Sequence, residues 1–138
     1  MYSLVEKRVN SRFCEKTVDN YENPAPGTVV DSGLIEYVPT TTQFDFYMIA
    51  HKATIATALP VHYLVAENST QMSKDEIQTF TYHLCHNFFN FMGTIKVPAA
   101  VMYAEKIARY THEHLYSKNI EAVQVPPNPK LSLNLHYI

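Results

Sequence analysis

Three cations near the N-terminus, Lys7, Arg8 and Arg12, are the first residues whose type and spacing could do chemistry. An arginine side chain presents a planar fork of N–H donors that matches the oxygens of a phosphate group. The cluster therefore indicates phosphate contact, and the competing interpretation is a set of solvated surface charges. The chain of 138 residues has a formal net charge of −2, so nucleic-acid binding would have to rest on such a local cluster.

Histidines are the second group of candidates. His83 and His86 stand three residues apart, so on a helix they would share a face, as paired metal ligands do. A third ligand at a supporting spacing is missing, and the neighbouring aromatic residues favour a packed face instead. His62 follows Pro60 in an expected strand, where a hydrogen-bonded core histidine is more common than a catalytic base.

The sequence contains no motif of nucleophilic or nucleotide-dependent enzymes. It has no G-x-S-x-G, no H-E-x-x-H, and only three glycines, too few to suggest a phosphate-cradling loop. Cys14 and Cys85 lack metal-ligand spacing and cannot build a disulfide framework, which favours a reducing intracellular compartment, cytoplasmic or nuclear. No apolar run reaches roughly 18 residues, so we expect no membrane partner.

The elements that must position these residues are strands followed by helices. Four stretches of apolar, β-branched or aromatic character predict strands at 2–9, 28–35, 44–50 and 62–66. Ser73 and Glu76 form a capping-box pattern at the start of a helix. Apolar residues then recur at helical spacing and predict that this helix ends at Gly93; they are Ile77, Phe80, Leu84, Phe88 and Phe91. Pro98 suits the first turn of a second helix.

Five sequence blocks follow one another in an order that is more specific than any single motif. They are VEKRVNSRFC at 5–14, PAPGTVVD at 24–31, FDFYMIAH at 44–51, PVHYLV at 60–65 and TYHLCHNFFNFMGTIKVPAAVMYAEKIA at 81–108. Over nearly its whole length the chain resembles the C-terminal part of the PIWI domain of Argonaute/Piwi proteins, and the Piwi branch most of all. The resemblance implies that residues 1–138 are an incomplete PIWI domain with an α/β, ribonuclease-H-like fold.

The resemblance also implies an enzymatic background. Active relatives are endoribonucleases that cut a paired target RNA with two divalent metals, normally Mg²⁺, held by carboxylates and one further side chain. Here the chain begins after the family's upstream catalytic carboxylates, and only the fourth catalytic position falls inside it. Glu105 occupies that position, where the family normally has a histidine. Either Glu105 replaces the imidazole as a metal ligand, or the lineage has lost cleavage; whether the protein is an enzyme stays open.

Several further residues acquire expected roles from the resemblance alone. Arg8 and Arg12 correspond to basic residues near the guide backbone, and Lys96 stands where a small polar residue touches a phosphate of the guide. Tyr110 occupies a position near the 5′ phosphate that is often basic, with Arg109 beside it. In the Piwi branch the C-terminal carboxylate helps to hold a metal at that phosphate, and Ile138 is the candidate here.

The function expected from this resemblance is guide-RNA binding in RNA-mediated gene silencing. The expected partners are a small guide RNA, a complementary target RNA and the remaining PIWI and MID portions of the full protein. The alternative is a PIWI-derived interaction module that neither binds nor cleaves RNA.

Overall fold

The structure, a computed structural model, describes residues 1–33, 43–115 and 129–130 of the chain. The chain forms two compact units, Met1–Pro98 and Ala99–Ile138. The first unit contains the described strands and helix α1 (Lys74–Leu84), and the second contains helix α2 (Ala99–Leu115). Among the described residues, no helix is both long and apolar enough to cross a bilayer.

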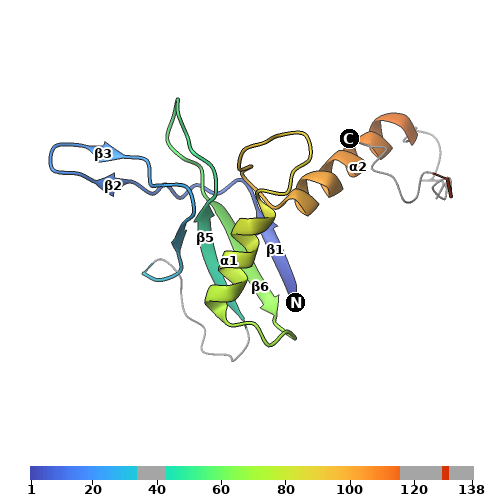
Figure 1. The fold of residues 1–138 in the computed structure, drawn as a ribbon, viewed down its shortest axis with the longest axis horizontal. Coiled ribbons are helices and arrows are strands. Elements are labelled where there is room, and N and C mark those ends of the chain that lie inside the picture. Colours follow the sequence, from blue (N-terminus) through green and yellow to red (C-terminus); the bar gives the residue numbers. More distant parts are fainter. Residues whose placement is uncertain (34–42, 116–128, 131–138) are drawn as a thin grey trace. The chain divides into compact units, whose positions relative to one another are not determined.

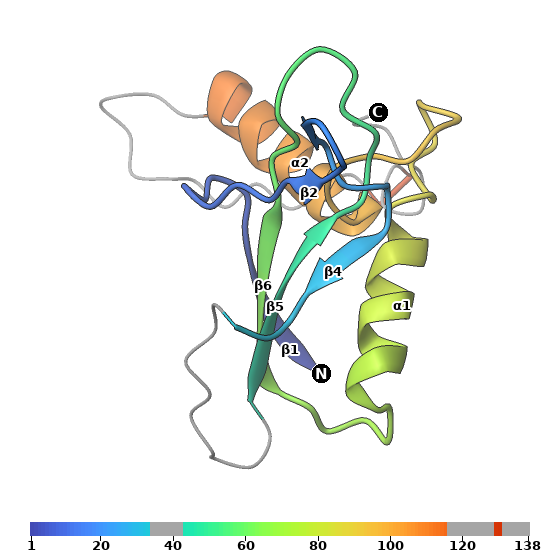
Figure 2. The ribbon, with the colours of Figure 1, turned by 90° about the vertical axis from the view of Figure 1, so that its left-hand side faces the viewer.

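A four-stranded sheet is the centre of the first unit, and α1 lies along one of its faces (Figure 1, Figure 2). The strand order is β1-β6-β5-β4, and each neighbouring pair is antiparallel. The strands are β1 (Tyr2–Glu6), β4 (Thr28–Val30), β5 (Phe44–Ile49) and β6 (Val61–Glu67). Two short strands, β2 (Glu15–Lys16) and β3 (Tyr21–Glu22), pair with each other in a separate ribbon. The predicted α/β architecture is confirmed.

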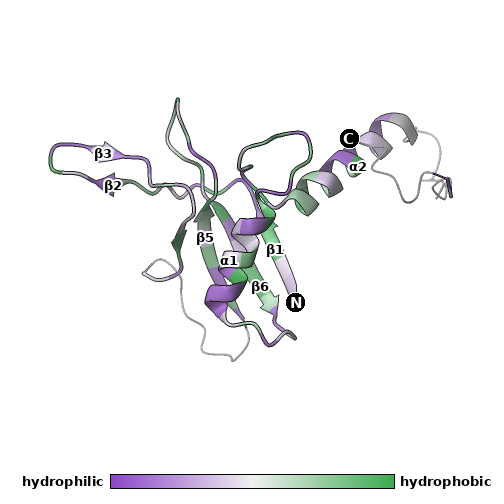
Figure 3. Ribbon diagram, in the orientation of Figure 1, coloured by the Kyte–Doolittle hydropathy of each residue, from purple (hydrophilic) through white to green (hydrophobic). Residues whose placement is uncertain are grey.

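The central strands alternate between a buried face and a partly exposed one, because successive side chains of a strand point to opposite sides. In β6, Val61, Tyr63 and Val65 are buried, whereas His62 is half-buried. The ring of Phe46 on β5 stacks on Tyr63 with centroids 5.0 Å apart. Hydrophobic residues are frequent in the strands of the four-stranded sheet, whereas β2 and β3 are hydrophilic and α1 carries residues of both kinds (Figure 3). The largest fully buried side chains are Phe46, Met48, Ile49, Pro60, Val61, Val65, Ile77, Cys85 and Val97.

Helix α1 begins at a capping box, as the sequence predicts. The Glu76 amide donates to Ser73 Oγ at 3.3 Å, and the Ser73 amide donates to the Glu76 carboxylate at 2.7 Å. The hydrogen bonds from the Ser73 backbone and hydroxyl lower the pKa of Glu76 below its ordinary value. Asp31, just after β4, accepts a hydrogen bond from Gln78 at 2.9 Å and pairs with Lys74 at 3.1 Å. The first two turns of α1 are therefore tied to the sheet.

The end of α1 differs from the prediction, because the helix stops at Leu84 with Cys85 as its cap rather than continuing to Gly93. Phe88 and Phe91 therefore lie in the loop that follows, and Phe91 is exposed. The chain turns back after the cap, so that the Ile95 amide donates to the Cys85 carbonyl at 2.9 Å. This long-range bond takes a carbonyl that a longer helix would have used for itself. The start of the second helix just after Pro98 is confirmed.

Candidate nucleic-acid interface

Lys96 is the centre of a group of cations that the fold brings together from distant parts of the chain. Its ammonium group donates a hydrogen bond to the Lys7 carbonyl at 3.2 Å, across 89 positions of sequence. Burial, and then the charges of Lys7 and Arg12, lower the pKa of Lys96 below its ordinary value. The segment after β1 and the segment before α2 thus present their positive charges at one place.

His51, which follows β5 and Ala50, belongs to the same group. Burial, and then the charge of Lys96, lower the pKa of its imidazole. Its Nδ1 atom is buried and has no hydrogen-bond partner among the described residues. A buried polar atom without a partner carries an energetic cost that a ligand can relieve. We call Lys7, Arg12, His51 and Lys96 the cationic cluster.

The segment that carries Lys7 and Arg12 is held in place by contacts of its own. The Arg12 guanidinium donates to the carbonyl of Val9 at 2.9 Å and to that of Ser11 at 2.8 Å, which ties this side chain to the backbone of its own segment. The ring of Phe13 meets Tyr47 of β5 edge-on, with centroids 5.5 Å apart. The cations therefore lie on a segment anchored at both β1 and β5.

The chemistry that suits the cationic cluster is the binding of an anion. Positive charges held close together raise one another's energy, and a bound anion removes that repulsion. An arginine fork and a lysine ammonium together suit phosphate oxygens. Lys96 has three N–H donors, and the bond to Lys7 uses one of them.

The structure brings together only some of the residues predicted to bind RNA. Arg8 and Arg12 are both exposed in the segment after β1, and the charge of Arg12 acts on Lys96 in the cationic cluster. His51 was missed by sequence reasoning, because nothing in the sequence marks it apart from its place at the end of the FDFYMIAH block.

The remaining predicted site residues lie outside the first unit. Glu105, Arg109 and Tyr110 are exposed on α2, and the Arg109 guanidinium forms an ion pair with Glu113 one turn later, at 3.8 Å. Ile138 lies outside the described residues. These roles therefore remain predictions.

The part of the chain that the structure describes contains no set of side chains suited to bind a metal ion. No three His, Cys, Asp or Glu side chains lie close enough there to hold an ion. Glu105 offers a single carboxylate, which by itself does not match the several carboxylates of a two-metal site. The His83 and His86 pair also lacks the third ligand that a zinc site needs. The described residues by themselves therefore form no metal site, and the role of Glu105 as a metal ligand remains a prediction.

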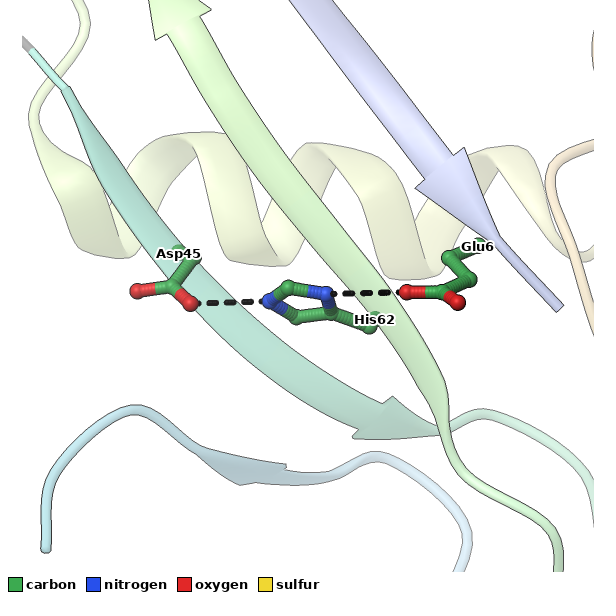
Figure 4. A network of polar contacts seen from close by, with 3 residues as sticks. All are labelled: Glu6, Asp45 and His62. Atoms are coloured by element: carbon green, nitrogen blue, oxygen red, sulfur yellow. Dashed lines mark hydrogen bonds and ion pairs between the residues drawn. The ribbon is translucent and has the colours of Figure 1, made fainter. Parts of the chain in front are cut away.

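A second polar network lies on the face of the sheet opposite α1 and has a structural role (Figure 4). His62 Nε2 lies 2.8 Å from Asp45 Oδ2, and His62 Nδ1 lies 3.6 Å from Glu6 Oε2. The ring of Tyr47 stacks on His62 with centroids 4.5 Å apart. These contacts link β1, β6 and β5. They confirm the prediction that His62 is hydrogen-bonded, but its ring lies on the partly exposed face of the sheet, so the predicted core position was wrong.

Of the two cysteines, Cys85 offers no nucleophile. Both are free thiols; Cys14 is exposed and Cys85 is buried at the end of α1. Burial raises the pKa of Cys85 to about 11, so its thiol stays protonated near neutral pH and is inert.

Comparison with known proteins shows which class of protein this fold belongs to. Two solved structures resemble the chain: Drosophila Piwi, with a TM-score of 0.67 and 31% identity over 80% of this chain, and Kluyveromyces polysporus Argonaute with a guide RNA, with a TM-score of 0.63 and 30% identity over 78%. The chain covers 14% and 13% of those two proteins. The fold is therefore that of Argonaute proteins.

Sequence comparison then gives the family. The Piwi domain family matches residues 1–116, and the chain belongs to this family. It is 38% identical over 107 residues to Piwi-like protein Ago3 of Bombyx mori, which covers 78% of this chain and 11% of that protein. It is 34% identical over 137 residues to human Piwi-like protein 3, which covers 99% of this chain and 14% of that protein. These relatives confirm the predicted similarity to the Piwi branch.

Proposed function

We propose that this chain contributes to guide-RNA binding by a Piwi-type protein in RNA silencing, and that the cationic cluster contacts the phosphate backbone. The observation that carries the proposal is the convergence of Lys7, Arg12, His51 and Lys96 in a chain whose net charge is negative. A fold that holds cations together against their own repulsion gains most when an anion binds among them. The similarity to an Argonaute solved with a guide RNA supports RNA as that anion.

The test is a binding titration of the chain with a short single-stranded RNA, followed by fluorescence anisotropy at several salt concentrations. Replacing Lys96 by Ala removes one phosphate contact, so we expect weaker binding and a salt slope reduced by about 0.7. Lys16→Ala, a change of the same charge on the separate β2–β3 ribbon, is the matched control and should leave the affinity nearly unchanged. Absence of RNA binding by the wild-type chain, or equal effects of the two variants, would favour the interaction module without RNA binding.

We propose that the 5′ phosphate of the guide RNA is bound by a second group of residues, which are Arg109, Tyr110 and the C-terminal Ile138 through its carboxylate. The experiment compares 5′-phosphorylated with 5′-hydroxyl RNA in the full-length protein. Arg109→Ala should reduce the preference for the phosphate, and extra residues after Ile138 should do the same. Glu113→Gln removes the ion-pair partner of Arg109 and should keep the preference, which makes it the control.

Glu105 is proposed to decide whether the full protein cuts a target RNA. If Glu105 is a ligand for Mg²⁺ supplied with the upstream carboxylates, Glu105→Ala in the full-length protein should abolish cleavage. The test measures target cleavage by the wild-type protein and by Glu105→Ala. It distinguishes a Glu105 that binds the metal from a lineage that has lost cleavage. Robust cleavage by both would refute the ligand role, and cleavage by neither would favour a lineage that binds RNA without cutting it.

A further inference from the structure

The loop that carries Lys96 is tied back to the end of α1 by a histidine whose two ring nitrogens both have partners. His86 Nδ1 lies 3.1 Å from the Tyr82 carbonyl oxygen, and His86 Nε2 lies 2.9 Å from Thr94 Oγ1. A carbonyl oxygen can only accept, so Nδ1 carries the proton and donates it. In the neutral ring, Nε2 then accepts from the Thr94 hydroxyl.

One backbone bond closes the same loop, and another fixes the turn at which the loop begins. The Ile95 amide donates to the Cys85 carbonyl at 2.9 Å, and the His86 amide donates to the His83 carbonyl at 3.0 Å. Val97, two residues after Ile95, is buried with 1% of its surface exposed. Lys96 therefore stands between a residue whose amide is bonded to the helix end and a residue held in the core.

Lys96 needs such support because its surroundings disfavour its charge. Burial and the positive charges of Lys7 and Arg12 act against the ammonium group at this position. A long lysine side chain on a loose loop would swing its charged end into water. A fixed backbone on both sides of Lys96 limits that escape and keeps the charge beside Lys7 and Arg12.

We propose that His86 and Thr94 are positioning residues for the cationic cluster, acting through Lys96; this inference rests on the proposed RNA-binding function. The pair forms a cross-link between the helix end and the loop, which we call the His86–Thr94 clamp. The side chains of the clamp need not touch RNA. They fix where the Lys96 ammonium meets a phosphate.

The chain supplies matched controls for each half of the clamp. His83 lies one turn before His86, is exposed, and has a tilted ring contact with Tyr82 at 6.4 Å. His83→Ala therefore removes the same side chain from the same helix end without touching the clamp. Thr94→Ser keeps the hydroxyl that bonds His86, whereas Thr94→Val keeps the shape and loses the hydroxyl.

RNA affinity is the first readout, measured by anisotropy with 5′-phosphorylated oligouridine. His86→Ala and Thr94→Val should weaken binding roughly two- to tenfold, the range that the loss of one net hydrogen bond covers. His83→Ala and Thr94→Ser should bind like the wild type. In a Lys96→Ala background, His86→Ala should cost no further affinity, because residues that act through one another are not additive.

Amide hydrogen exchange is the second readout and does not depend on RNA. His86→Ala and Thr94→Val should speed exchange of the Ile95 amide and leave that of Phe46 in β5 unchanged, which also shows that each variant is folded. An unchanged rate of exchange of the Ile95 amide in folded Thr94→Val would refute the proposed clamp. So would wild-type affinity in both clamp variants, or a further loss of affinity in the Lys96→Ala background. If the wild-type chain binds no RNA, or Lys96→Ala binds normally, the proposed function itself fails, whatever the exchange rates show.

Discussion

The first turn of α1 is held by Ser73 and Glu76, three residues apart, whereas its last turn is held by Thr94 and Ile95, about ten residues beyond the helix end. The first arrangement forms as soon as one turn of helix forms, because both partners belong to that turn. The second forms only when the following loop has folded back. A helix start can thus be a property of local sequence, while a helix end depends on the tertiary structure.

The two ends of α1 also differ in what they support: we expect the start to contribute to stability and the end to contribute to RNA binding. The capping box lies at the end of α1 that is tied to Asp31 and β4, away from the residues of the cationic cluster in the sequence. Lys96 lies two residues after Thr94 of the His86–Thr94 clamp. We therefore expect changes at the start of α1 to alter stability alone, and changes at its end to alter RNA binding.

The largest expected effect comes from the buried face of α1, which holds the whole helix on the sheet. Ile77 is 1% exposed and is the fourth residue of α1. Ile77→Ala should lower the free energy of unfolding by about 2–5 kcal/mol, because it removes buried methyl groups and leaves a cavity. Urea denaturation checks this value, with the exposed Thr79→Ala on the same helix as the control. A loss below that of the control would mean that the helix packs loosely on the sheet.

Ser73→Ala is a direct test of the local end. Loss of the N-cap hydroxyl should cost about 1 kcal/mol of unfolding free energy and leave RNA affinity unchanged. Ser32→Ala, at an exposed serine outside the helices and strands, should cost nothing measurable. Reduced RNA affinity in folded Ser73→Ala would contradict the separation between the two ends.

Acid should weaken the link between the start of α1 and β4. The hydrogen bond from Gln78, and then that from Lys74, lower the pKa of Asp31, so its contribution is full above the unfolded value near 3.8. That contribution is lost as the pH falls below this value toward the folded pKa. Because Asp31 is about one-third exposed, we expect a loss below about 1 kcal/mol. Denaturation across this pH range should show the loss in the wild type and a smaller one in Asp31→Asn.

The smallest expected effect is a pH dependence of RNA binding at the other end. Burial and then the charge of Lys96 lower the pKa of His51, so in the folded chain this imidazole takes up a proton at a pH below the ordinary value of 6.5. A bound phosphate favours the charged imidazole, so binding should take up a proton and strengthen as the pH falls. Between pH of about 7.5 and 6 we expect roughly a two- to threefold gain in the wild type. The gain should be smaller in His51→Gln, and equal gains in the two proteins would exclude His51 from the interface.

Much of the fold could be predicted because its signals are local. The β-branched and aromatic runs at 28–30, 44–49 and 61–67 are strands, and Pro98 directly precedes α2. The end of α1 could not be predicted, because Phe88 and Phe91 continue its helical spacing although the chain has already left the helix. Spacing records which residues would share a face if the helix continued. It does not show whether the Cys85 carbonyl accepts a hydrogen bond from a further turn of the helix or from the Ile95 amide.

The candidate site likewise has features that the sequence predicts and features that only the tertiary structure creates. The sequence by itself determined the family, the start of α1, the alternation of β5 and β6, and the presence of Arg12 and Lys96. The tertiary structure decided that Lys96 bonds the Lys7 carbonyl across 89 positions and that the Nδ1 atom of His51 is buried where the charge of Lys96 acts on the ring. A cap or an alternating strand depends on neighbours within a few residues, whereas a cluster of like charges exists only where the packing of the core holds distant segments together.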